Sequence, residues 1–313
     1  MAEQFRGVYG IPVTPFTEDG SAVDFAALEA VIDYTIEAGA HGLVNPVNVS
    51  EFFTLTDQER KDVTEATVKV CAGRVPVIAG VPGASKAQAV EFARHAARVG
   101  VDSVMAVPPY VKAAGREEII DYFQAIGMAA ELPVWIQNCT GAVGTQMPPA
   151  LLADIIRSCE HVEWLKEETD NSSHNMTQAM ELSGDALKGV MGGKGGRFLL
   201  DEFRRGACGT MPGSELTEIH VALWEALEAG DQERIREAYN VMLPLINVEN
   251  QYGGAVFCKE VFRRRGLIPT AIARQPGVQV LDEFDHLRLD EMLADADAYF
   301  TNHKPAQERP AGV

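Results

Sequence analysis

The sequence has little positive charge for its length. Lys and Arg together number 27 against 45 Asp and Glu, which gives a formal net charge of −18 over 313 residues. A protein this acidic repels a phosphate backbone, so we expect no nucleic-acid partner. A small anionic substrate is compatible with this charge, because a pocket can be locally positive.

Metal-binding and redox motifs are missing as well. The five cysteines lie at positions 71, 139, 159, 208 and 258 without CxxC spacing, and the seven histidines form no HxH or HExxH set. These absences argue against a disulfide framework and against a zinc site, so we expect no metal. The run GGKGG (192–196) fits neither the P-loop nor the dinucleotide-binding spacing, so we expect no cofactor.

Long apolar runs are also absent. No run approaches the roughly 18 residues of a membrane span, and the opening MAEQFRGVYG lacks a charged-then-apolar signal pattern. We therefore expect a cytoplasmic protein without membrane contact. Apolar residues make up 46% of the chain, enough for a substantial core.

What the sequence does contain is a regular alternation of short apolar runs and helical patterns. We expect strands within 7–16, 41–47, 75–81, 102–109, 133–139, 162–168, 187–193 and 207–213. We expect helices at 24–38, 57–71, 85–99, 116–131, 148–157 and 173–182, and two more that end near residues 205 and 228. Asp24 and Thr56 stand where they would cap the first two helices.

This alternation predicts an α/β fold. Strands that are apolar nearly throughout are typical of a parallel sheet buried on both faces. Eight strand–helix units over about 220 residues favour a closed (β/α)8 TIM barrel over an open doubly wound sheet. We predict a barrel over residues 1–230, a helical extension packed on it over 231–302, and a polar tail over 303–313.

One predicted strand contains a lysine, in the run VEWLKEET (162–169). With a period of two residues, Trp164, Lys166 and Glu168 share one face. A lysine is rarely buried without a reason. The alternative to a functional role is an edge strand that leaves the lysine in water.

The barrel gives this lysine a possible use. Active sites of such barrels lie at the C-terminal ends of the strands. There the amine of Lys166 could attack a substrate carbonyl and form a Schiff base, provided that burial keeps it neutral. We therefore predict Lys166 as a catalytic residue.

Five segments around these strands resemble the dihydrodipicolinate synthase and N-acetylneuraminate lyase family of Schiff-base barrels. They are GVYGIPVTPF (7–16), SEFFTLTDQER (50–60), VPVIAGV (75–81), AVPPY (106–110) and WLKEET (164–169). Their order and spacing agree over roughly residues 5–300, and Lys166 occupies the family's Schiff-base position. The resemblance also implies a homo-oligomer, with the family's tetramer as the expected form.

The departures from the family pattern are informative. The second strand of the family usually ends Gly-Thr-Thr-Gly-Glu, but this chain reads VNVSE (47–51). The fifth usually ends Tyr-Asn, with the tyrosine as proton shuttle, whereas this chain has Gln137. Val111 replaces the second tyrosine of the usual Pro-Tyr-Tyr. The hydroxyl relay of the synthases is thus absent at three positions.

These departures resemble one branch of the family, the 2-keto-3-deoxy-L-arabonate dehydratases. The branch also shares Lys-x-Glu-Thr at strand six, LPLINVEN (243–250) and the glycines of KGVMGGKGG (188–196). The resemblance implies that Lys166 forms an imine with the C2 ketone of a 2-oxo-3-deoxy sugar acid. The imine acidifies C3, a base removes its proton, and the neighbouring hydroxyl leaves as water. From the arabonate, the product would be 2,5-dioxopentanoate.

The resemblance also implies roles for other residues. Gln137 is expected to act in catalysis by orienting the leaving hydroxyl or a hydrolytic water. The expected substrate-binding residues are Asn48, Val49, Ser50, Tyr110, Gly193, Lys194 and Met211. Ser50, with the backbone amides of Val49 and Ser50, would hold the substrate carboxylate. Lys194 is either an anion-steering group or an ordinary loop residue, and Glu51 is expected to be structural.

Two other functions stay open at this point. A retro-aldolase would share the imine but cleave the C3–C4 bond to give pyruvate and an aldehyde. A non-catalytic keto-acid sensor would keep the fold without the imine chemistry. A deaminase acting on a cyclic imine of hydroxyproline breakdown is a narrower variant of the dehydratase.

Overall fold

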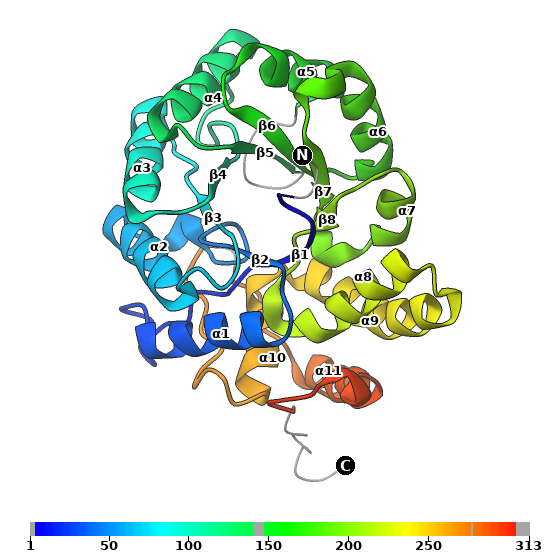
Figure 1. Cartoon of the computed structure of the whole chain (residues 1–313). Coiled ribbons are helices and arrows are strands. Elements are labelled where there is room, and N and C mark those ends of the chain that lie inside the picture. The colour runs from blue at the N-terminus through cyan, green and yellow to red at the C-terminus, as the bar shows by residue number, and fades with distance from the viewer. Residues whose placement is uncertain (1–3, 140–146, 277, 305–313) are drawn as a thin grey trace.

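The computed structural model describes residues 4–139, 147–276 and 278–304. Within them, eight parallel strands pair in chain order and close into a barrel, with helices around it (Figure 1). The strands are β1 (Gly7–Gly10), β2 (Gly42–Val44), β3 (Val77–Gly80), β4 (Ser103–Ala106), β5 (Val134–Cys139), β6 (Val162–Glu168), β7 (Gly189–Gly192) and β8 (Gly209–Thr210). The predicted (β/α)8 barrel is confirmed.

The outer ring holds eight α-helices, each following its strand. They are α1 (Phe25–Glu37), α2 (Asp57–Cys71), α3 (Lys86–Val99), α4 (Arg116–Ala130), α5 (Pro149–Ser158), α6 (Ser172–Ser183), α7 (Leu199–Arg204) and α8 (Thr217–Ala229). Both predicted caps are present: Asp24 accepts from the backbone of Ala27, and Thr56 forms a capping box with Glu59. These bonds satisfy amides that the first turn of a helix leaves free.

Several strands are shorter than the apolar runs that predicted them. The run 7–16 forms a strand only over β1, and the run 41–47 only over β2. Pro12, Pro15 and Pro46 follow these strands and have no N–H to donate to a neighbour, so the ladder cannot continue through them. Ile11 and Val47, just beyond the two strands, stay buried in the apolar cluster inside the barrel.

An aromatic cluster fills the N-terminal part of the barrel interior. We call Phe5, Tyr9, Trp135 and Trp164 the aromatic floor. Trp135 and Trp164 are stacked with ring centroids 4.9 Å apart, and Phe5 meets Trp164 edge-on at 5.0 Å. All four side chains are almost fully buried. The floor closes the barrel below the residues that follow on β5 and β6.

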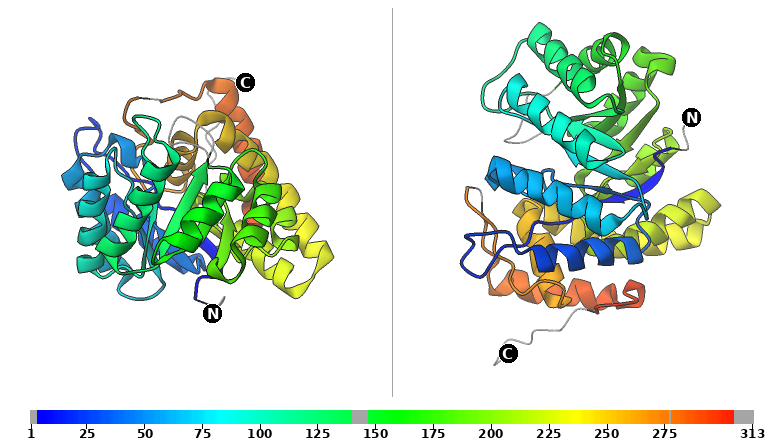
Figure 2. Two further views of the ribbon diagram at one scale, coloured as in Figure 1. Left: turned by 90° about the horizontal axis from the view of Figure 1, so that it is seen from above. Right: turned by 60° about the vertical axis from the view of Figure 1, so that its left-hand side comes forward.

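Three further helices follow the barrel: α9 (Gln232–Tyr252), α10 (Ala255–Arg264) and α11 (Glu283–Asp295). In Figure 2 they lie against α1 and α8 at one side of the barrel. Their apolar faces join barrel residues in a single cluster that includes Val8, Leu223, Met242, Phe262 and Leu289. The extension therefore shares its core with the barrel. Of the predicted polar tail, residues 305–313 lie outside the described part.

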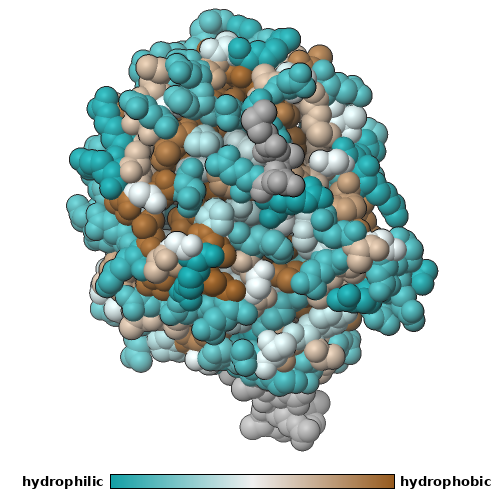
Figure 3. Space-filling model, in the orientation of Figure 1, coloured by the Kyte–Doolittle hydropathy of each residue, from teal (hydrophilic) through white to brown (hydrophobic). Residues whose placement is uncertain are grey.

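Polar side chains cover most of the face of the molecule seen in Figure 3, and apolar side chains show in patches between them. Among the described residues, no helix is both long enough and apolar enough to cross a membrane.

Candidate active site

Strands β5 and β6 place polar side chains directly above the aromatic floor. Trp135 pairs with Trp164, and two residues further on Gln137 pairs with Lys166. The period of two puts Lys166 and Glu168 on the same inner face as Trp164. Because β6 is paired on both sides, with β5 and β7, the edge-strand alternative for Lys166 is wrong. Only 3% of Lys166 is exposed.

Lys166 has a carboxylate beside it. Its Nζ lies 3.2 Å from Oε2 of Glu168. The amide of Gln137 donates to Oε1 of the same carboxylate, and the backbone N–H of Lys194 donates to Oε2 at 3.4 Å. Glu168 is therefore fixed between three donors. A carboxylate in this position can exchange a proton with the amine.

The amine opens into a cavity of about 230 Å³. The lining residues come from the loops after β1, β2, β7 and β8, from the ends of β5 and β6, and from α9 with the turn after it. They are Ile11, Asn48, Val49, Cys139, Lys166, Glu168, Lys194, Gly195, Met211, Gly213, Glu249, Asn250, Gly253 and Gly254. Drug-sized ligands occupy roughly 300–1,000 Å³, so this cavity suits a smaller molecule.

Five of the predicted site residues line this cavity: Lys166, Asn48, Val49, Lys194 and Met211. Gln137 stands one step behind it, bonded to Glu168. The Oδ1 atom of Asn48 is buried without a hydrogen-bond partner, so it is free to accept from a ligand hydroxyl. Nζ of Lys194 is engaged in an ion pair with Asp170 at 2.6 Å.

Besides Gln137, three predicted residues are not among those lining the cavity. The hydroxyl of Ser50 is fully buried and donates to the carbonyl of Pro12 at 2.7 Å. The predicted contact of this hydroxyl with a substrate carboxylate therefore needs correction, because its only proton already fixes the loop. Tyr110 packs edge-on against Phe52, with ring centroids 5.5 Å apart. Gly193 lies behind Glu168, where a Cβ would come within 2.1 Å of Oε2.

Two acidic residues at the cavity were not predicted. Glu168 carried a local signal, since it follows Lys166 by two residues on one strand face. Glu249 carried none, because α9 brings it to the barrel mouth from the extension. Its segment LPLINVEN entered the prediction only as part of a family resemblance.

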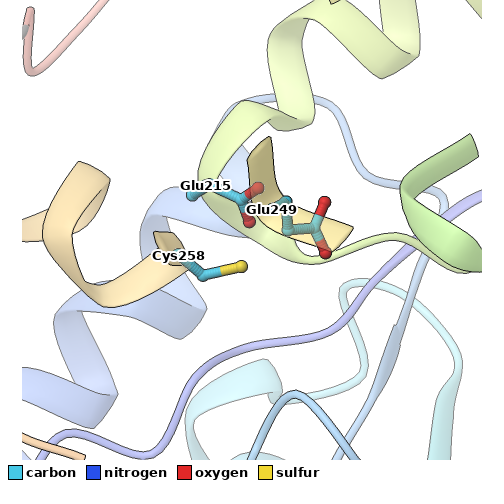
Figure 4. A group of neighbouring side chains, drawn as sticks. All are labelled: Glu215, Glu249 and Cys258. Carbon is cyan, nitrogen blue, oxygen red and sulfur yellow. The ribbon is translucent and has the colours of Figure 1, made fainter. Parts of the chain in front are cut away.

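Behind the cavity, Glu249 meets two other buried side chains (Figure 4). Glu215 comes from the turn before α8 and Cys258 from α10, and one oxygen or sulfur atom of each of the three lies within 4.8 Å of the others. Within the described residues this is the one group of three or more such side chains. Carboxylates and a thiol at this spacing could hold a metal ion, or they could hold protons.

Burial sets the charge of this group. It raises the pKa of the Glu249 carboxyl well above its usual range, and the neighbouring carboxylate of Glu215 raises it further. Burial also raises the pKa of the Glu215 carboxyl and of the Cys258 thiol. Each shift favours the protonated, uncharged form.

Glu51 and a second buried lysine lie away from the cavity wall. Lys259 on α10 forms an ion pair with Glu51 and donates to the carbonyl of Ile272 at 2.8 Å. Oε1 of Glu51 also accepts from the backbone N–H of Arg274 at 2.9 Å. These bonds tie the loop after β2 to the extension, in keeping with the structural role predicted for Glu51.

Known proteins are similar to this chain in sequence and in fold. Residues 4–294 match the model of the Dihydrodipicolinate synthetase family. L-2-keto-3-deoxyarabonate dehydratase of Azospirillum brasilense is 31% identical over 274 residues, 87% of this chain and 88% of that protein. 4-hydroxy-tetrahydrodipicolinate synthase of Methanopyrus kandleri is 30% identical over 249 residues, 78% of this chain and 81% of that protein.

A solved structure agrees with these sequence matches. Dihydrodipicolinate synthase from Rhodopseudomonas palustris superposes with a TM-score of 0.84 at 26% identity, covering 93% of this chain and 98% of the other. The family match thus spans the whole barrel and most of the extension, and it includes the strand that carries Lys166. The chain belongs to the dihydrodipicolinate synthetase family.

Proposed function

We propose that this protein is a Schiff-base lyase that dehydrates a 2-oxo-3-deoxy sugar acid, with 2-keto-3-deoxy-L-arabonate as the first candidate and 2,5-dioxopentanoate as its product. Membership of a family that contains lyases and dehydratases supports an enzyme of the lyase kind. The dehydratase of Azospirillum brasilense, which matches nearly the full chain, supports the choice of substrate.

The observation that carries the proposal is the environment of Lys166. Its amine is buried in a closed barrel, faces a small cavity, and has the carboxylate of Glu168 at 3.2 Å. A buried lysine beside a proton acceptor is the arrangement that imine formation with a ketone requires. The aromatic floor seals the barrel below it.

The first steps follow from this geometry. Glu168 accepts a proton from Lys166, and the neutral amine attacks the C2 ketone; Glu168 then gives this proton to the hydroxyl of the adduct, which leaves as water to give the imine. C3 of the substrate is then only two bonds from the lysine nitrogen. Glu168, beside that nitrogen, is therefore placed to remove a proton from C3.

Loss of the C4 hydroxyl as water then forms a C3–C4 double bond conjugated with the imine. Movement of a proton from C5 to C3 converts this intermediate to the C4–C5 enol. Hydrolysis frees Lys166, and the enol becomes the aldehyde of 2,5-dioxopentanoate. Imine formation releases one water and hydrolysis consumes one, so the substrate loses one water overall.

Gln137 favours dehydration over the synthase reaction. It occupies the strand-five position where the synthases have a proton-shuttling tyrosine, and an amide cannot titrate near neutral pH. Its amide instead donates to Glu168 and fixes that carboxylate. With the Ser50 hydroxyl bound to Pro12, backbone amides near Val49 are left to bind the substrate carboxylate.

Product analysis tests the proposal. Purified protein is incubated with 2-keto-3-deoxy-L-arabonate, and dioxopentanoate and pyruvate are quantified separately by NMR. We expect dioxopentanoate without pyruvate. Pyruvate without dioxopentanoate would establish the retro-aldolase instead. In parallel, borohydride is added with pyruvate: a mass gain on the peptide that contains Lys166 is expected, and its absence would point to a sensor.

A further inference from the structure

The carboxyl of Glu249 belongs both to the cavity wall and to a buried acidic group. It lines the cavity together with Lys166 and Glu168, and on its other side it meets Glu215 and Cys258 (Figure 4). Glu215 is fully buried and 5% of Glu249 is exposed. One side chain thus connects a buried carboxyl pair with the space where a substrate would bind.

The oxygens of this pair have few partners. Oε2 of Glu249 is buried without a hydrogen-bond partner, and the side chain beside the buried carboxyl of Glu215 is the thiol of Cys258. Backbone packs closely against them: a Cβ on Gly195 would lie 2.6 Å from Oε2 of Glu249, and one on Gly213 would lie 2.4 Å from Oε2 of Glu215. Native proteins rarely leave such atoms unsatisfied, so these oxygens indicate something further at this position.

Protonation makes a buried carboxyl neutral and turns one of its oxygens into a hydrogen-bond donor. The two cations that act on this pair, Lys166 and Arg265, form their ion pairs with Glu168 and Glu218 instead. Two negative charges this close in a dry environment repel each other strongly, and two carboxyls in this situation retain a proton. The groups that face Glu249 are Lys166 and Glu168 from β6, Glu215 from the turn before α8, and Cys258 from α10.

We propose that Glu249 is the general acid of the dehydration: it holds a proton beside Glu215 and donates it to the hydroxyl that leaves C4. This inference rests on the proposed function. It supplies the proton donor that the missing tyrosine relay leaves unassigned. Glu215 is a positioning residue that acts through Glu249.

The proton balance closes with two carboxyls. Glu168 takes the C3 proton while Glu249 gives its proton to the C4 oxygen; the C4–O bond breaks and the C3–C4 double bond forms. The Glu249 carboxylate then accepts a proton from C5, and Glu168 returns its proton to C3. Both carboxyls recover their starting state, and one water has left.

The test separates imine chemistry from loss of the hydroxyl. Pyruvate has no leaving group, so exchange of its methyl protons in D2O, followed by NMR, reports imine formation and C3 deprotonation alone. For Glu249→Gln we expect this exchange to stay within about twofold of wild type, while dehydration of 2-keto-3-deoxy-L-arabonate falls by about 10²- to 10⁴-fold. Retained exchange also shows that the variant is folded.

Glu168→Gln is the matched control variant, because it also converts a carboxyl at the cavity to an amide. We expect it to lose both pyruvate exchange and dehydration. Glu215→Gln removes a neighbouring carboxyl that becomes negative as the pH rises, and so should lower the pKa of Glu249. Because the acid must be protonated, the alkaline limb of the kcat/KM profile should move to lower pH in this variant.

Three results would overturn the assignment. They are wild-type dehydration by Glu249→Gln, loss of pyruvate exchange in that variant, and stoichiometric bound metal in the purified protein that disappears in Cys258→Ser. A wild-type protein that exchanges pyruvate protons but forms no dioxopentanoate would overturn the proposed function as well. If wild type and Glu249→Gln dehydrate equally, only the role of Glu249 fails.

Discussion

Two buried lysines, one at the barrel mouth and one in the extension, meet opposite environments. Lys259 is fully buried, pairs with Glu51, donates to a backbone carbonyl at 2.8 Å and lies 4.1 Å above the centre of the Phe16 ring. Lys166 is 3% exposed, opens to a cavity and has Glu168 at 3.2 Å. Burial is thus common to both, and access to a small molecule separates them.

The contrast shows how to distinguish a structural buried charge from a reactive one. The partners of Lys259 enclose it and bind Glu51 to the extension, so its charge is fully used by the fold. Glu168, the partner of Lys166, also accepts hydrogen bonds from Gln137 and Lys194, and the nitrogen of Lys166 faces the cavity. Substitution of Lys166 should therefore affect catalysis, and substitution of Lys259 should affect stability.

The largest effect is expected for Lys166→Met. We expect dehydration to fall by about 10⁴-fold or more, because a methionine side chain has no amine with which to form the imine. Borohydride trapping with pyruvate should disappear, while the free energy of unfolding, measured in urea, should change by less than for Lys259→Met. A variant that keeps catalysis would show that the two lysines do not differ as described.

Lys259→Met should act on stability instead. Removing one partner of a buried ion pair leaves the other charge uncompensated, which typically costs about 3–5 kcal/mol. We expect that loss in the free energy of unfolding, with borohydride trapping at Lys166 retained in the folded protein. The double variant Glu51→Gln/Lys259→Met is the control: it should recover part of the loss. No recovery would mean that packing of the Lys259 stem, and not its charge, accounts for the effect.

A smaller, pH-dependent effect is expected at Glu202, which extends the comparison to a buried acid without a cation. Its Oε1 accepts from Ser172 at 2.9 Å, its Oε2 has no partner, and burial raises its pKa to about 7. Between about pH 4.5 and 7 the unfolded chain loses this proton while the folded protein keeps it, so stability falls as pH rises through this window.

Glu202→Gln removes this dependence without changing the shape of the side chain. Relative to the variant, wild type should lose up to about 3 kcal/mol between these pH values, from the shift of about 2.5 units. Urea unfolding at several pH values measures it. Parallel stability curves for the two proteins would show that Glu202 stays ionised in the fold.

Much of the fold could be predicted because its signals are local. Eight apolar runs with helical patterns between them, and caps such as Asp24 and Thr56, depend only on residues near one another in sequence. The strand ends could not be placed from apolarity alone, because apolar residues beyond Pro12 and Pro46 are buried although they lie outside the strands. Lys166 was predictable for the same local reason: a lysine stands out in an apolar strand.

The rest of the site depends on contacts between distant segments. Ser50 looks like a substrate-binding hydroxyl in sequence, but the first-strand loop brings the Pro12 carbonyl to it. Glu249 lies on a helix whose sequence pattern indicates only packing against the barrel. The path of α9 brings this residue to the cavity that Lys166 also lines. No spacing rule along the chain links Glu215, Glu249 and Cys258.

Both the barrel and the extension line the cavity, and this has a consequence for how such a protein can diversify. The strand β6 that carries Lys166 is paired with both neighbouring strands, which leaves little room for change there. The wall opposite is supplied by α9 and the glycine turn after it, which no strand constrains. The shape of the cavity can therefore be altered through that helix and turn while the strand that carries Lys166 stays the same.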